Sequence, residues 1–396
     1  MRRNFKLILI FLIILTFLSF GSLTYGKTDT LTLWISWEGK DRYEEIVNEF
    51  RSLTGISIDV VSVPKIYQKI KTVARGGGKL PDMAILRNAY IGNLADEGII
   101  KPLPKGIEDK LSEKGKMAFS YRDKLYGLPF YFDAQVVYYN PKLLKEVGLS
   151  DPPTSWTLND LKRYGKALKN IKGVTPLGWG AYSPYFFGGF EYSFKKDCIK
   201  CQRERFFTEA TEKAILFYKE LIKDGIGVSM DRNAFLAGFK GGKIGFIIFG
   251  TFILPNFIEE GVDFKVIPLP INPETGKRVA SYLDYKGISL FKTEKKGDNV
   301  YKFLTYLTDP DVQYRFCSPL YKFPDAKSAL EKIFSENPYL SPLRETVETG
   351  IIAPKESIYV YYDKALSNVL KLVLEKNIPI NKAFAAGRRY MKGKEK

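Results

Sequence analysis

The order of apolar and polar residues in the first part of the chain predicts a strand, a helix and a second strand. Leu31–Trp37 reads as a strand, and a helix follows from Asp41, with Glu44 as the partner of a capping box. Apolar residues recur at helical spacing until Gly55 ends the helix, and residues 56–63 form the second strand. This β-α-β opening predicts a parallel, layered α/β unit.

The alternation of helix and strand patterns continues through the rest of the chain. Its length of 396 residues exceeds what one hydrophobic core usually holds, so two domains are expected. The helix near residues 158–169 has Thr157 as its N-cap and Asp160 as a capping-box partner. We expect further helices near residues 67–74, 208–224, 361–374 and 381–391, strands near 83–86 and 244–249, and a helix that begins at Asp309-Pro310.

The most informative stretch of the chain covers residues 126–156. It reads as a short strand, a bend at Asp133, a buried strand, a turn at Asn140-Pro141 and a helix that Gly148 ends. Three short motifs lie in it, in this order: Gly127-Leu128-Pro129, Tyr139-Asn140-Pro141 and Pro152-Pro153-Thr154-Ser155-Trp156.

These motifs resemble the crossover region of bacterial extracellular solute-binding protein family 1, the maltose-binding-protein-like sugar-binding proteins of ABC transporters. The one departure is a residue inserted before the Trp. The resemblance extends over nearly the whole chain beyond residue 26, and further segments occur in the order typical of the family. They are residues 50–60 (FRSLTGISIDV), 80–103, the Gly-rich segment that ends at Gly250, and 302–313 (KFLTYLTDPDVQ).

The resemblance implies an α/β fold of the two-lobed periplasmic-binding-protein class, type II, with a ligand cleft between the lobes. Three hinge crossings are expected near residues 132–135, 282–286 and 321–325. Lobe 1 would then contain residues 27–131 with 286–322, and lobe 2 residues 132–285 with 323–396. Ligands bind in clefts of this kind, beyond the carboxyl ends of strands.

Sugars need aromatic rings for their apolar faces and polar side chains for their hydroxyls. The resemblance therefore implies nine candidate binding residues. On the lobe 1 side and at the first crossing they are Trp37, Glu38, Arg87, Asn88 and Asp133, the last as a hydroxyl acceptor. On the lobe 2 side they are Tyr185, Phe252, where the family commonly has Trp, and Tyr359 and Tyr361, which would share a face if their segment is extended.

Structural interpretations of several candidates remain open from the sequence. Trp37 would otherwise cover the edge of the lobe, and Asn88 would otherwise cap the next helix. Asp133 would otherwise be a turn residue, and Tyr359 would otherwise pack within a helix.

The N-terminus has the features of an export signal over residues 1–26. Basic residues at positions 2, 3 and 6 precede an apolar run, Leu7–Phe20, and Thr24-Tyr25-Gly26 resembles a cleavage site. An uncleaved anchor is the alternative, although the run is shorter than the about 20 residues of a membrane span. The sequence around the predicted cleavage site contains no Cys, so a lipid anchor is not indicated. The protein is therefore expected to be periplasmic or extracellular.

The formal net charge of +17 raises the question of an acidic partner. Lys and Arg residues are, however, dispersed along the chain, and only the C-terminal tail forms a basic cluster. This distribution favours a solvated surface over a nucleic-acid site. We expect no nucleic-acid partner and a monomeric protein.

The chain has no His, which excludes Ser-His-Asp and Cys-His catalysis and HExxH zinc hydrolysis. Cys198 and Cys201 have redox or metal spacing, but too few other ligands are present for zinc, so a small disulfide or two thiols are expected. Cys317 reads as a buried apolar residue. We expect no cofactor and no metal.

The resemblance and these exclusions together predict a non-catalytic protein that binds an oligosaccharide and delivers it to the membrane permease of an ABC importer. One alternative is an iron(III)-binding relative with tyrosine ligands, either Tyr138-Tyr139 or Tyr361-Tyr362. A less favoured alternative is a glycan-cleaving enzyme that uses the carboxylates of Glu38 and Asp133. The sequence does not name the sugar.

Overall fold

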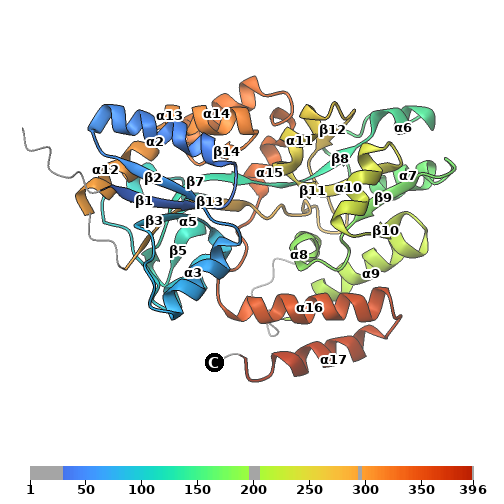
Figure 1. Ribbon diagram of the computed structural model, residues 1–396. Coiled ribbons are helices and arrows are strands. Elements are labelled where there is room, and N and C mark those ends of the chain that lie inside the picture. The colour runs from blue at the N-terminus through green and yellow to red at the C-terminus, as the bar shows by residue number, and fades with distance from the viewer. Residues whose placement is uncertain (1–29, 196–205, 293–296, 395–396) are drawn as a thin grey trace, which may run out of the picture.

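The computed structural model of the chain describes residues 30–195, 206–292 and 297–394. Two β-sheets lie side by side, and helices cover them (Figure 1). The α/β class with two sheets agrees with the fold expected from the sequence. The predicted signal segment, Cys198 and Cys201 lie outside the described residues.

The first sheet is mixed, because β1 pairs in parallel with β2 and β3, whereas β13 pairs antiparallel with β3 and β7. The parallel pair β1–β2 flanks helix α2 (Lys40–Thr54), which confirms the predicted β-α-β opening. In spatial order, the strands are β14 (Phe323–Pro324), β7 (Leu128–Asp133), β13 (Asp284–Phe291), β3 (Met83–Arg87), β1 (Leu31–Ile35) and β2 (Ile58–Ser62), and β4 (Ile100–Lys101) pairs with β13.

The second sheet is also mixed, since β11 runs parallel to β9 and antiparallel to β8. Its spatial order is β10 (Gly227–Ser229), β9 (Thr175–Trp179), β11 (Ile244–Gly250), β8 (Gln135–Tyr139) and β12 (Lys265–Ile267). A small separate hairpin consists of β5 (Ser120–Tyr121) and β6 (Lys124–Leu125).

Helices surround each sheet and bury its apolar side chains. Beside the first sheet lie α2, α3 (Ile66–Arg75), α4 (Ile91–Asp96), α5 (Glu113–Phe119), α12 (Gly297–Leu307), α13 (Pro310–Cys317) and α14 (Lys327–Glu336). Around the second sheet lie α6 (Pro141–Glu146), α7 (Leu158–Leu168), α8 (Pro184–Ser193), α9 (Glu209–Lys223), α10 (Arg232–Lys240) and α11 (Leu254–Glu259). The chain continues through α15 (Arg344–Thr349) to α16 (Ile358–Leu374) and α17 (Ile380–Met391).

The two sheets are joined where β7 leads directly into β8. Only Ala134 separates these strands, and Phe132, Ala134 and Val136 belong to one apolar cluster that contains residues of both sheets. We call each sheet with the helices around it one half of the molecule. Residues 280–283 join the second half to β13 in the first sheet. The core is therefore continuous through the junction.

The third predicted crossing, near residues 321–325, differs from what the structure contains there. Phe323 and Pro324 pair with β7 in the first sheet, and α14 packs on α13 beside them. Further along the chain, Tyr282 and Ile351 form a parallel bridge next to the junction. The division of the chain into lobes stays a prediction.

Local predictions were confirmed at some helix starts and wrong at one. The capping box of Thr157 and Asp160 at the start of α7 is present, and Cys317 is buried as predicted. The capping box predicted for Asp41 is wrong, because α2 begins at Lys40 and its N-cap is Gly39 with φ 78°. Strand β1 also ends at Ile35, two residues before the predicted end, so Trp37 lies in a turn.

Leu168→Ala and Leu216→Ala form a matched pair that tests the packing around the second sheet. Leu168 is fully buried on α7, whereas Leu216 on α9 is 49% exposed. We expect Leu168→Ala to lower the free energy of unfolding by about 2–5 kcal/mol, because it leaves a cavity in the core. Leu216→Ala should change it by less than about 0.5 kcal/mol. Urea unfolding measures both, and equal effects would contradict this packing.

Candidate functional site

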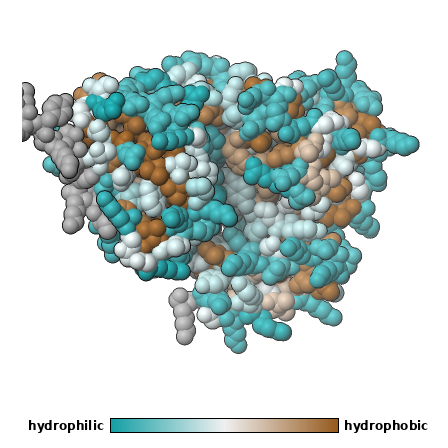
Figure 2. All heavy atoms as spheres, viewed as in Figure 1, coloured by the Kyte–Doolittle hydropathy of each residue, from teal (hydrophilic) through white to brown (hydrophobic). Residues whose placement is uncertain are grey.

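A cavity of about 890 Å³ lies between the two halves of the molecule. Figure 2 shows a hollow between them, and segments next to both sheets contribute residues to the cavity walls. Aromatic side chains dominate these walls. They include Trp37, Tyr185, Phe252, Tyr282, Tyr359 and Tyr362.

Every residue predicted for the binding site lines this cavity, except one. Those present are Trp37, Glu38, Arg87, Asn88, Asp133, Tyr185, Phe252 and Tyr359. They come from the turn after β1, the end of β3 and the residue after it, the end of β7, the first turn of α8, the turn after β11 and the first turn of α16. The chain folds so that the ends of these elements meet at the junction of the sheets, which is where ligands bind in such folds.

Tyr361 is the exception, because its segment is helical rather than extended. In α16 the residue that shares a face with Tyr359 is Tyr362, whose ring centroid lies 6.2 Å from that of Tyr359. Tyr362 lines the cavity, whereas Tyr361 lies next to Lys394, whose Nζ is 5.3 Å from its ring centroid. The helical interpretation of this segment, left open by the sequence, is therefore confirmed.

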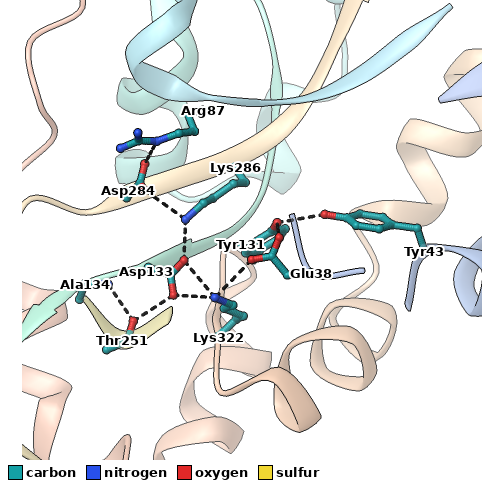
Figure 3. A network of polar contacts seen from close by, with 10 residues as sticks. All are labelled: Glu38, Tyr43, Arg87, Tyr131, Asp133, Ala134, Thr251, Asp284, Lys286 and Lys322. Carbon is teal, nitrogen blue, oxygen red and sulfur yellow. Dashed lines mark hydrogen bonds and ion pairs between the residues drawn. The ribbon is translucent and has the colours of Figure 1, made fainter. Parts of the chain in front are cut away.

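An ionic network forms the floor of the cavity, and its charges alternate in sign (Figure 3). The Arg87 Nε lies 2.7 Å from Asp284 Oδ1, and Asp284 Oδ2 lies 3.2 Å from the Nζ of Lys286. Lys286 then donates to Asp133 Oδ2 at 2.5 Å. Lys322 continues the network, since its Nζ is 2.9 Å from Asp133 Oδ1 and 3.2 Å from a Glu38 oxygen.

The order of the strands explains the order of the charges. Strands β3, β13 and β7 are neighbours in the first sheet, and β14 pairs with the far side of β7. Arg87 ends β3, Asp133 ends β7 opposite Asp284 of β13, and Lys322 precedes β14. From Arg87 to Lys322 the network therefore crosses the cavity edge of the sheet one strand at a time, and Glu38, from the turn after β1, pairs with Lys322 outside this order. It contains three basic and three acidic side chains, namely Arg87, Lys286, Lys322, Glu38, Asp133 and Asp284.

Asp133 is the centre of this network and is fully buried. Besides the two lysines, the Thr251 hydroxyl donates to Asp133 Oδ1 at 3.0 Å, and the same hydroxyl accepts from the Ala134 N–H at 3.1 Å. Both carboxylate oxygens already accept hydrogen bonds from protein groups. Asp133 is thus the counter-ion of two buried lysines, and the sugar-hydroxyl role expected for it has no unused acceptor position in this arrangement.

The electrostatics of the floor follow from this pairing. Burial would raise the pKa of Asp133, but the ammonium groups of Lys286 and Lys322 outweigh it and lower the pKa to about 2. Burial lowers the pKa of Lys286, and the carboxylates of Asp133 and Asp284 more than reverse this, so its pKa is raised. Removing one partner from a buried pair typically costs about 3–5 kcal/mol, because the other charge is left without compensation.

Two buried polar atoms near this floor have no hydrogen-bond partner among the described residues. They are Asn88 Nδ2 and the hydroxyl of Tyr185. Asn88 is 1% exposed and begins the short helix η1 (Asn88–Tyr90), whose N-cap is Arg87 without a side-chain bond, so its expected alternative as a helix cap is wrong. Because unsatisfied buried polar groups are costly, these two atoms are candidates for hydrogen bonds to water or to a ligand.

The wall beside α10 and η4 (Thr251–Ile253) adds a cation that the sequence did not indicate. The Arg232 guanidinium carbon lies 5.2 Å and 5.8 Å from the ring centroids of Phe249 and Phe252. All three residues line the cavity. Stacked guanidinium and phenyl groups present both an apolar face and hydrogen-bond donors.

Carboxylates on the second half of the cavity complete its polar groups. Burial raises the pKa of Glu191, whose Oε1 accepts from Thr211 at 2.9 Å. Burial also raises the pKa of Asp363, on α16, to about 6. The cavity therefore offers acceptors on this side and donors on the side of Arg87 and Asn88.

Several cavity residues were not found from the sequence. Lys286 and Lys322 lie within segments predicted as crossings, but dispersed lysines read as solvated surface. Thr251 and Tyr282 carry no pattern that separates them from ordinary core residues. Thr251 is identified only by its hydrogen bond to Asp133, which lies more than a hundred residues earlier in the sequence. Tyr282 is identified only by its place in the cavity wall.

The alternatives left open by the sequence are not favoured by this geometry. Tyr138 and Tyr139 lie on opposite faces of β8, since they belong to different apolar clusters, so the pair cannot hold one iron. The second pair is also divided, because Tyr362 lines the cavity whereas Tyr361 lies next to Lys394. Glu38 and Asp133 share the ammonium of Lys322 and are therefore counter-ions rather than an acid–base pair.

Comparison with known proteins identifies a family. Residues 36–314 match the family model described as bacterial extracellular solute-binding protein. A putative binding protein of Brucella abortus is 26% identical over 296 residues, 69% of this chain and 70% of the relative. The maltotriose-binding protein of Pyrococcus abyssi is 24% identical over 79% of this chain and 70% of its own length.

The fold is shared with solved structures of binding proteins. A cyclo/maltodextrin-binding protein, complexed with maltotetraose, superimposes with a TM-score of 0.80 at 20% identity, covering 93% of this chain and 98% of that one. In the part of the chain that the structure describes, no helix is long and apolar enough to span a membrane.

Asp133→Asn tests the charge state of the floor. With a pKa of about 2 in the folded protein and about 3.9 in the unfolded chain, the carboxylate adds stability that is complete above about pH 5 and is lost as the pH falls through 2. This contribution is about 2–3 kcal/mol. We expect the variant to be destabilised by about 3–5 kcal/mol at pH 7 and the difference from the wild type to shrink towards pH 2.

Urea unfolding of both proteins at a series of pH values between 2 and 7 measures that difference. Comparing variant and wild type removes the titration of all other carboxylates from the result. A difference that stays constant over the whole range would contradict a buried, charged Asp133.

Proposed function

We propose that this chain, which belongs to the bacterial extracellular solute-binding protein family, binds an oligosaccharide in the cavity between its two sheets. The observation that carries the proposal is the composition of that cavity, where aromatic rings on both walls surround a floor of charged groups. Aromatic faces stack on the apolar faces of sugar rings, and charged or amide groups bond to hydroxyls. The volume of about 890 Å³ lies in the range of ligand pockets.

The aromatic residues have distinct roles in this proposal. Trp37 supports the sugar from the first half, and Tyr185, Phe252 and Tyr359 support it from the second. Phe252 retains a stacking face but lacks the indole donor of the Trp that is common in the family. Arg87 and Asn88 supply donors for hydroxyls at the floor.

Relatives support the sugar as the class of ligand. One is named a maltotriose-binding protein, and a solved structure of the same fold holds maltotetraose. The family is one of solute-binding proteins rather than catalysts. We therefore include delivery of the bound sugar to the permease of an ABC transporter, by an exported, monomeric protein that carries a signal over residues 1–26.

Binding would close the two halves around the sugar. Hydrogen bonds link the segments that join the halves, from the Gln135 N–H to Ser281 Oγ at 2.7 Å and from the Leu283 N–H to the Ile351 carbonyl at 3.0 Å. We place the hinge at these joined segments, so the third crossing falls near Ile351. A sugar that contacts both halves favours the closed arrangement by its extra contacts there.

A thermal-shift screen of the chain from residue 27 tests the class of ligand. We expect one group of oligosaccharides to raise the melting temperature, because a ligand that binds only the folded state stabilises it. The panel contains maltotriose, maltotetraose, galacto-oligosaccharides, acidic sugars and polyols, and ferric citrate tests the iron alternative. The proposal would be overturned if only ferric citrate raised the melting temperature, or if no saccharide raised it.

Tyr359→Ala and Tyr361→Ala form a matched pair within one helix. Tyr359 lines the cavity, whereas Tyr361 faces Lys394. For the saccharide found by the screen, we expect Tyr359→Ala to weaken binding about tenfold, as loss of one aromatic contact does. Tyr361→Ala should leave affinity within about twofold of the wild type. Calorimetric titration measures both, and an equal loss in the two variants would place the site elsewhere.

A further inference from the structure

Two segments at the cavity floor have backbone conformations that non-glycine residues rarely adopt. Glu38 has φ 65°, and Tyr321, which precedes Lys322, has φ 53°. Left-handed conformations of such residues are unfavourable and persist only where surrounding contacts hold them. Glu38 itself and Lys322, the residue after Tyr321, form an ion pair with each other.

Lys322 joins these segments to the strand at the junction. Its Nζ lies 3.2 Å from Glu38 Oε1 and 2.9 Å from Asp133 Oδ1, and the side chains of all three are at most 7% exposed. Glu38 also accepts from the Tyr131 hydroxyl at 2.5 Å, and Figure 3 shows the carboxylates of Glu38 and Asp133 converging on the Lys322 ammonium. In so buried a place, the two contacts of Lys322 are weakly screened by water.

The turn that carries Glu38 depends on side chains for its position. Strand β1 ends at Ile35 and α2 begins at Lys40, so residues 36–39 lie outside the sheet ladder and the helix. Lys286 differs, because it lies within β13, where strand pairing with Tyr131 and Arg87 fixes its backbone. The contacts of Glu38 with Lys322 and with the Tyr131 hydroxyl therefore restrain the turn, and the turn carries Trp37 of the cavity wall.

We propose that Lys322 is a positioning residue, which fixes the Trp37 wall of the cavity to the junction strand by joining Glu38 to Asp133. The inference rests on the proposed function only in that the cavity is where the ligand binds. Lys322 acts through its two carboxylate partners. It keeps the turn in a strained conformation that places the indole for stacking before a sugar arrives, which lowers the ordering cost of binding.

The first test needs no ligand. Trp156 and Trp179 are 0% and 1% exposed, so in a Trp34→Phe background acrylamide quenches the fluorescence of Trp37 alone. We expect Lys322→Met, which keeps the aliphatic stem, to raise the quenching constant of Trp37, because the turn relaxes. Glu38→Gln should do the same, and the Glu38→Gln/Lys322→Met double variant should resemble each single variant rather than their sum.

Lys213→Met is the matched control. Lys213 pairs with Glu209 and Glu274 on the surface, away from the cavity, and its loss should leave the quenching of Trp37 unchanged. Unchanged quenching in both Lys322→Met and Glu38→Gln would overturn the proposal, as would strictly additive effects in the double variant. If Lys322→Met fails to fold, Glu38→Gln still gives the decisive measurement, because Lys322 keeps its ion pair with Asp133 in that variant.

A second measurement uses maltotetraose as the probe. By calorimetric titration we expect Lys322→Met and Glu38→Gln each to weaken its binding about tenfold, with a non-additive double variant. Additive losses would mean that Lys322 binds the sugar directly and would overturn the positioning role. Absence of maltotetraose binding to the wild type would count against the proposed sugar, whereas the quenching result would still decide the role of Lys322.

Discussion

The buried carboxylate of Asp133 is the interaction on which the cavity depends. It lies at the end of β7, where the chain leaves the first sheet for the second, and it compensates two buried lysines that come from separate parts of the sequence. None of these three charges is stable there alone, because a buried charge without a partner is too costly. The three charges come together only if β13, the residues before β14 and the junction between β7 and β8 adopt one relative arrangement.

This neutralisation also determines what the cavity can offer a ligand. The carboxylates of Glu38, Asp133 and Asp284 are bound to cations of the protein, so the floor presents little unpaired negative charge. The contacts left to a ligand include the aromatic walls, Asn88 Nδ2, the hydroxyl of Tyr185, the Arg232 guanidinium and the carboxylates of Glu191 and Asp363. Such a surface suits a solute that has apolar ring faces and several hydrogen-bonding groups.

The fold could be predicted from the sequence, because its elements and motifs are local patterns, and the resemblance carried by those motifs implied eight residues that line the cavity. Motifs around Pro129 and Asn140 identified the junction, and elements that end there carry the aromatic residues. Failures arose where long-range contacts override local rules. Lys286 and Lys322 look like surface residues until Asp133 is placed between them. Tyr361 was expected in the cavity because residues two apart share a face in an extended segment, whereas in helix α16 residues three or four apart do.

An apolar floor of similar volume would be at least as stable as this ion network, by general experience with buried ion pairs. The network's contribution is therefore geometric. An apolar contact tolerates sliding, whereas a carboxylate between two ammonium groups and the Thr251 hydroxyl has a narrow range of favourable distances and angles. Thr251 belongs to the second half and the lysines to the first, so the same carboxylate relates both halves to the junction. In the closure proposed above, such a fixed point would tie the contacts made by the walls to one defined arrangement of the two halves.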